Sequence, residues 1–360
     1  MTGYHKIFAN TTYGDHSHHD DGGHTHGVNG FHATFYWIAA VTTIPFSCIG
    51  LIMNVFLAFL FVKDKFFHTV SYTLMLVSII SDSISNFAVI TNYVYLLGTS
   101  FDHSHGVILC KLVNYCLLAS YGISILNLSL IGITRYFAIV RPYCLFYRKY
   151  RHKIILIAEL FICISALSLA IPSLFHVETY HQDAVLCGFI RISKSVSTYL
   201  ITIVFFLYLL PSIIIGLVYG RIIKHQRKYV RPGQPSNEEQ ADERIRKRKF
   251  IRMLISITLP YILITWPYFV TLAGFSITHR SMRYLLNENN ALFVLAFCSL
   301  SITSSITVLN PIFLLKFGCC IRGRVVLLLN KMGITAAAIQ PEITIVGNKT
   351  TISLLEKSKS

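Results

Sequence analysis

Residues 112–134 read LVNYCLLASYGISILNLSLIGIT, an uncharged run of 23 residues between Lys111 and Arg135. A helix needs about 20 such residues to cross the hydrocarbon core of a bilayer, so this run predicts a transmembrane helix. Comparable apolar runs recur along the chain, and only Asp82 and Glu159 place a carboxylate inside one. Together they predict an all-α membrane protein, a bundle of seven transmembrane helices at residues 35–62, 69–97, 110–134, 154–175, 196–220, 253–277 and 291–315.

The composition excludes an ordinary soluble enzyme. Of the 360 residues, 54% are hydrophobic and 13% are charged, whereas soluble domains average about 25% charged residues. The rest of the chain divides into short loops and two tails, which are too small to form a hydrophobic core of their own. We expect a His-rich extracellular tail over 1–34, a seven-helix domain over 35–318, and a short amphipathic eighth helix with a cytoplasmic tail over 319–360. No catalytic activity is expected.

The lysines and arginines indicate the orientation. Of the 32, six lie on one side of the predicted membrane (Lys6, Lys111, Arg191, Lys194, Arg280 and Arg283), and all the others lie on the opposite side. Basic residues collect on the cytoplasmic side, so the N-terminus is predicted to lie outside the cell. The net charge of +16 then indicates attraction to anionic membrane lipids and acidic partners, and nucleic-acid binding is not expected.

The cysteines agree with this orientation. Cys110 and Cys187 fall on the predicted outer side, where an oxidising environment permits a disulfide between them. Cys319 and Cys320 follow the last span in the basic, apolar stretch KFGCCIRGRVVLLL. Thiols in such a juxtamembrane position are candidates for palmitoylation, with free cytosolic thiols as the alternative.

Several motifs, in order along the chain, resemble those of the rhodopsin-like (class A) G-protein-coupled receptors, over about residues 35–330. The matching stretches are GLIMNVF with Gly50 and Asn54, the intramembrane Asp82, ITRYFAIVRPY with Thr134, Arg135 and Tyr136, Pro211 with Tyr219, TWPYF with Trp266, and LNPIFL with Asn310 and Pro311. The resemblance implies a multi-pass plasma-membrane receptor that couples an extracellular ligand to a heterotrimeric G protein. Serines and threonines of the last thirty residues are candidate sites for arrestin recruitment.

The resemblance implies an activation switch at Thr134, Arg135, Tyr136, Tyr219, Trp266, Asn310 and Pro311. Thr134 stands where the family has an acid, and Lys247 falls where a second acid is expected. Neither can hold Arg135 by charge, so we expect a weakly latched inactive state with basal signalling. In TWPYF either Trp266 or Thr265 fills the position of the family's switch tryptophan.

A carboxylate is costly in the middle of a bilayer, which makes Asp82 a candidate functional residue. The resemblance places Asn54, Ser124, Thr307 and Asn310 around it, a group that holds a sodium ion in related receptors. Oxygen ligands suit such a cation. The alternative is a protonated Asp82 satisfied by hydrogen bonds alone. No other cofactor or metal is expected.

The ligand class follows partly from absences in the sequence. Residues 112–134 contain no acid, with Leu117 at the position expected for the aspartate of amine receptors, so an amine ligand is disfavoured. No lysine lies between Lys249 and Lys316 to bind retinal. The candidate pocket residues are Asn92, Asn114, Leu117, Tyr121 and Tyr268. The basic residues on the predicted outer side favour a peptide ligand, and a small non-amine ligand, melatonin-like or anionic, is the alternative. A transporter or channel is a distant alternative, because the sequence shows few charges that could line a transport pathway and no internal repeats.

The N-terminal tail contains the sequon NTT at Asn10, a candidate glycosylation site. The sequons at Asn127 and Asn348 are predicted to lie within the membrane and inside the cell, where they are not used. Clustered histidines such as those in GDHSHHDDGGHTHG can bind zinc or copper, but the composition favours a disordered tail, so no metal site is predicted.

Overall fold

The computed structural model describes residues 25–97, 103–141, 145–179, 187–228 and 238–331. Residues 1–39 and 40–360 form two compact units. In the first unit the described residues are helical, and they begin α1 (Thr25–Lys63). The other elements are η2 (Lys65–Phe67), α2 (Val70–Leu97), α3 (His103–Ile139), α4 (Leu145–Ala170), α5 (Ser173–His176), β1 (Val177–Thr179), β2 (Cys187–Phe189), α6 (Lys194–Val204), η3 (Phe205–Leu209), α7 (Leu210–Lys228), α8 (Glu238–Thr278), α9 (Met282–Glu288), α10 (Asn290–Ser304), α11 (Ile306–Phe317) and α12 (Cys319–Lys331).

Seven helical segments in the described chain are long and apolar enough to cross a membrane, which confirms the predicted number of spans. Spans one to four are α1, α2, α3 and α4. Span five combines α6, the π-helical turn η3 and α7, span six is α8, and span seven combines α10 and α11. Pro45, Pro260, Pro267 and Pro311 lie inside helices, where neighbouring helices can satisfy the freed carbonyls.

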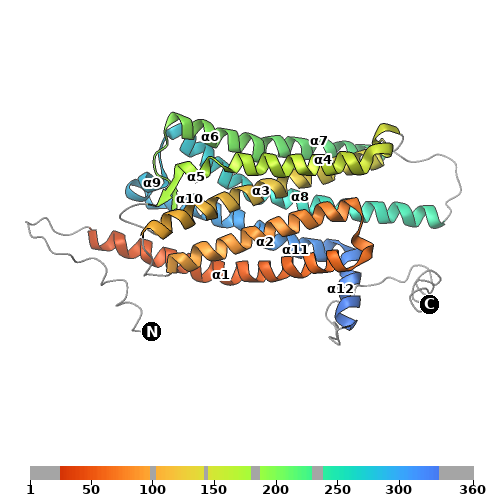
Figure 1. Cartoon of the computed structure of the whole chain (residues 1–360), viewed down its shortest axis with the longest axis horizontal. Coiled ribbons are helices and arrows are strands. Elements are labelled where there is room, and N and C mark those ends of the chain that lie inside the picture. Colours follow the sequence, from red (N-terminus) through yellow and green to blue (C-terminus); the bar gives the residue numbers. More distant parts are fainter. Residues whose placement is uncertain (1–24, 98–102, 142–144, 180–186, 229–237, 332–360) are drawn as a thin grey trace, which may run out of the picture. The chain divides into compact units, whose positions relative to one another are not determined.

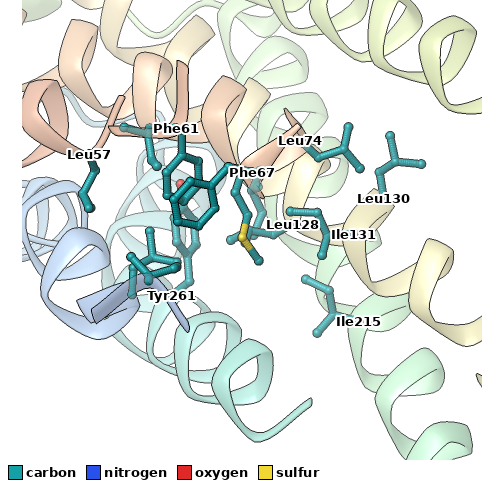
Figure 2. Packing of buried hydrophobic residues seen from close by; sticks show 14 of the residues in the cluster. Leu57, Phe61, Phe67, Leu74, Leu128, Leu130, Ile131, Ile215 and Tyr261 are labelled. Carbon is teal, nitrogen blue, oxygen red and sulfur yellow. The ribbon is translucent and has the colours of Figure 1, made fainter. Parts of the chain in front are cut away.

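Helix α3 occupies a central place within residues 40–360, where it packs against α2, α4 and α7 (Figure 1). The inner part of this unit is held by apolar side chains that gather from several helices. Figure 2 shows members of this cluster, among them Leu57, Phe61, Phe67, Leu74, Leu128, Leu130, Ile131, Ile215 and Tyr261. Because lipid tails are as apolar as these side chains, close van der Waals packing is what stabilises their association.

A glycine allows spans one and seven to approach closely. A Cβ atom at Gly50 would lie 2.6 Å from Cγ2 of Val308, which is closer than side chains tolerate. The absence of a side chain at Gly50 therefore lets α1 and α11 touch, in the way that small residues do at membrane helix interfaces.

The predicted eighth helix is present as α12, and it is fixed to the first inner connection. Ile321 and Val325 are buried on one of its faces. Arg324 lies 3.4 Å from the Asp64 carboxylate and 4.6 Å from the centre of the Phe66 ring. Burial and charge together thus anchor α12, and its Cys320 thiol forms no disulfide.

Candidate ligand cavity and polar core

A cavity opens among α2, α3, α5, α6, α8, α10, α11 and the paired strands β1 and β2. Its lining residues are Ser85, Val89, Asn114, Leu117, Leu118, Tyr121, Ser173, Val177, Phe189, Leu200, Ile203, Tyr268, Leu272, Leu300, Thr303, Ser304 and Thr307. Four of the five pocket residues proposed from the sequence are among them. Asn92, which is half-buried on α2, is not among the residues that line this cavity.

The predicted disulfide positions one wall of this cavity. Cys110 at the outer part of α3 is bonded to Cys187, the first residue of β2. Asn114 strengthens the junction, because its amide lies 3.0 Å from the Cys110 carbonyl oxygen and 2.9 Å from Sγ of Cys187. Phe189, two residues after Cys187, lines the cavity, and Val177 opposite it on β1 is fully buried.

The chemistry of the cavity is neutral. Each of the lining residues named above is uncharged, and apolar or aromatic side chains form most of the walls. The exceptions are the amide of Asn114 and the hydroxyl groups of the serines and threonines, which are Ser85, Ser173, Thr303, Ser304 and Thr307. Such a lining accommodates an apolar or aromatic group that carries a neutral hydrogen-bonding end, and it offers an ammonium group no carboxylate.

Tyr121 connects the cavity with span six. Its hydroxyl donates to Oγ1 of Thr265 at 3.2 Å, and Thr265 in turn donates to the Tyr261 carbonyl oxygen at 2.8 Å. Ring centres of Tyr261 and Phe269 each lie 5.4 Å from that of Tyr121. These contacts build an aromatic layer below the ligand cavity.

The same layer resolves the ambiguity in TWPYF. Thr265 is fully buried at the contact with Tyr121, whereas the Trp266 side chain is 49% exposed on the outer surface of the bundle. The inclusion of Trp266 among the interior switch residues therefore needs correction. Successive residues on a helix point about 100° apart, so moving the tryptophan next to the proline turns it out of the interior.

Asp82 lies in a network of hydrogen bonds. Ser124 donates to Oδ1 of Asp82 at 2.9 Å, and Asn310 donates to Oδ2 at 2.8 Å. The amide of Asn54 donates to the Thr307 carbonyl oxygen at 2.9 Å. The structure thus brings together the five residues that the resemblance grouped.

Asn86 is a further member of this network that the sequence reading missed. Its amide donates to the Asp82 carbonyl oxygen at 3.0 Å, and its Oδ1 accepts from the Thr307 hydroxyl at 3.0 Å. A spacing of four residues from Asp82 places Asn86 on the same helix face, which is the signal that was available. Thr307 also lines the cavity, so the polar network and the ligand cavity share a side chain.

At the inner end, Thr134 is buried and donates to the Ile131 carbonyl oxygen at 2.8 Å, within its own helix. The neighbouring Arg135 lies close to Tyr72, Tyr147 and Tyr219, and also to Arg151, whose like charge repels it. The Tyr219 hydroxyl accepts a hydrogen bond from Thr258 of α8 at 3.4 Å. Span five and span six thus meet beside Arg135, while the side chain of Lys247 lies outside the described part of the chain.

The remaining assigned residues divide into two groups. Pro311 is buried in α11, Tyr136 packs half-buried against the inner cluster, and Asn127 is fully buried, in agreement with an unused sequon. Asn10, the histidine run up to residue 24 and the last 29 residues lie outside the described residues. Glycosylation, palmitoylation and arrestin recruitment stay predictions.

Comparison with known proteins identifies the family of this chain. A family model described as 7 transmembrane receptor (rhodopsin family) matches residues 53–314. The chain is 22% identical to the substance-P receptor of Aquarana catesbeiana, over 80% of this chain and 69% of that protein. It is 26% identical to galanin receptor 2a of Danio rerio, over 61% of this chain and 61% of the relative's own length. The chain belongs to the rhodopsin family of seven-transmembrane receptors.

Proposed function

We propose that this receptor converts the binding of an extracellular peptide into activation of a heterotrimeric G protein. As a member of its family, the chain is a non-enzymatic, multi-pass receptor of the plasma membrane. One observation carries the proposal: Thr307 belongs both to the ligand cavity and to the polar network around Asp82. A ligand that contacts the floor of the cavity can thereby favour one arrangement of the network over another.

Two observations support a peptide. The relatives reported above are, by their names, receptors for substance P and galanin, both of which are peptides. In addition, Arg191 and Lys194 are exposed just after β2, the strand that contributes Phe189 to the cavity. A neutral aromatic end of a peptide fits the cavity, while acidic groups farther along the peptide meet the basic residues outside it.

The inner end supports coupling to a G protein. An outward displacement of α8 would separate Thr258 from Tyr219 and open a groove beside Arg135. An amphipathic helix of the G protein would enter that groove, a common mode of peptide recognition. Because Thr134 forms its hydrogen bond within α3 and carries no charge, it cannot form an ion pair with Arg135, and some signalling without ligand is expected.

We also propose that Asp82 binds a sodium ion in the inactive state. Besides the carboxylate, the network contains the Oδ1 atom of Asn54, which is buried and accepts no hydrogen bond from the described residues. Buried oxygens without donors suit a hard cation and its water molecules. A protonated Asp82 would instead leave the stability of the receptor independent of sodium.

A screen of a peptide library tests the proposal directly. Cells expressing the receptor with a promiscuous G protein should respond to a peptide whose activity requires an aromatic or amidated end. Leu117→Glu, which places a charge in the neutral cavity, should abolish the response. Phe175→Ala, at an exposed residue of α5, is expected to preserve the response. A response to small anionic or melatonin-like compounds, with none to peptides, would contradict the ligand class.

A further inference from the structure

The hydroxyl group of Tyr261 is buried without a hydrogen-bond partner among the described residues. The side chain is fully buried in the inner cluster (Figure 2). Its hydroxyl oxygen is shielded from solvent and forms no hydrogen bond with the described residues. Buried polar groups are nearly always hydrogen-bonded to protein or to ordered water, and phenylalanine would fill the same apolar space without such a requirement.

A complementary acceptor lies on the helix that packs against α8. Asn310 of α11 is buried, and its amide nitrogen donates to Oδ2 of Asp82. Its Oδ1 atom accepts no hydrogen bond from the described residues. The helices α8 and α11 pack directly on each other, and Tyr261 is close enough to the Asp82 carboxyl group for the charge of one to affect the other.

We propose that the Tyr261 hydroxyl donates a hydrogen bond, through ordered water, to Oδ1 of Asn310 and so joins span six to the Asp82 network. One donor and one acceptor, each otherwise without a partner among the described residues, then satisfy each other. Tyr261 acts through Asn310 and is a positioning residue: it holds α8 against α11 while the inner end of the bundle is closed.

This relay also has a connection to the ligand cavity. Tyr121 lines the cavity, and its ring lies 5.4 Å from that of Tyr261. A ligand that shifts Tyr121 would displace the Tyr261 ring and weaken the hydrogen bond to Asn310. In this respect the inference rests on the proposed function, whereas the relay itself does not.

A double-mutant cycle on the purified receptor in lipid nanodiscs tests the relay without any ligand or G protein. Tyr261→Phe should lower the midpoint of thermal unfolding by about 2–4 °C, the shift that accompanies loss of one hydrogen bond. In an Asn310→Ala background the same substitution should have no such effect, because its partner is gone. Tyr199→Phe provides a matched control: it removes a hydroxyl that donates to the Leu169 carbonyl oxygen at 3.0 Å, and its effect should be the same in both backgrounds.

An unchanged or raised midpoint for Tyr261→Phe would overturn the relay, since removal of an unsatisfied hydroxyl stabilises a protein. That result decides the matter even if Asn310→Ala does not fold. A second readout concerns signalling: Tyr261→Phe should raise basal nucleotide exchange on the G protein about fivefold, as expected when one hydrogen bond of the closed state is lost. If no variant of the receptor stimulates exchange, the proposed coupling fails, and the relay is still judged by the thermal cycle.

Discussion

The side-chain amide of Asn54 on α1 donates a hydrogen bond of 2.9 Å to the backbone carbonyl oxygen of Thr307 on α11. The two residues are far apart in the sequence, and the missing side chain at Gly50 lets their helices come this close. Thr307 then directs its hydroxyl to Asn86 of α2. Three spans are therefore joined at one residue, which also lines the ligand cavity.

Gly50→Ala should destabilise the receptor. The added Cβ atom would lie 2.6 Å from Cγ2 of Val308, so the helices must separate or Val308 must move. Overpacking of this kind costs about 1–3 kcal/mol, which thermal unfolding in nanodiscs would detect as a lower midpoint. Gly216→Ala is the matched control, because a Cβ atom there meets nothing within 4 Å. Equal midpoints for the two variants would argue against close packing at Gly50.

Removal of the disulfide should damage the outer face. The bond between Cys110 and Cys187 spans a sequence separation of 77, and closing so long a loop contributes about 4 kcal/mol on the chain-entropy model. Cys110→Ser combined with Cys187→Ser should lower both the unfolding midpoint and the amount of receptor at the cell surface. Cys163→Ser, at a cysteine outside any disulfide, serves as the control. Wild-type surface expression of the double variant would show that the bond is dispensable.

Thr134→Asp should reduce basal signalling. An aspartate next to Arg135 restores a charge partner at the inner end of α3 and favours the closed state. Partly exposed ion pairs contribute up to about 1 kcal/mol, so basal nucleotide exchange should fall roughly threefold. Ser129→Ala, which alters a hydroxyl bonded within the same helix, controls for general effects on α3. Unchanged basal exchange in Thr134→Asp would count against a weak latch at this position.

Sodium should stabilise the receptor through Asp82. Replacing N-methylglucamine chloride by sodium chloride at constant ionic strength is expected to raise the unfolding midpoint of the wild type, because a ligand that binds only the folded state stabilises it. Asp82→Asn should remove the sodium effect. Glu159→Gln, which changes the other carboxyl group within the predicted spans, should retain it. A wild type that is insensitive to sodium would instead favour a protonated Asp82.

The features of the fold that the sequence predicted correctly are those marked by long apolar runs or by a characteristic residue type. Apolar runs revealed the seven spans, and the two outer cysteines predicted the bond that positions β2. Helix α8 begins at Glu238, well before the predicted span at 253, because charged residues continue a helix without adding to an apolar run. Hydropathy locates the part of a helix that lies in lipid, not its ends.

Within the site, the outcome depended on side-chain direction. Ser124 and Asn310 were correctly grouped with Asp82, whose charge marked the position. Neutral residues such as Asn86 and Ser85 gave no comparable signal in an apolar helix, and Asn92, which was assigned to the pocket, is not among the residues that line the cavity. Whether Thr265 or Trp266 faces the interior of the bundle depends on a difference of one residue along α8, which only the packing against Tyr121 reveals.

Nucleotide exchange tests the central claim most directly. The purified receptor in nanodiscs, mixed with a panel of heterotrimeric G proteins, should accelerate the exchange of GDP for GTP on at least one of them without added ligand. Arg135→Ala should reduce that acceleration to the level of empty nanodiscs, because it removes the guanidinium group beside Tyr219 at the inner end. An exchange rate with the wild-type receptor that equals the rate with empty nanodiscs for every G protein tested, with and without the peptide library, would contradict the account.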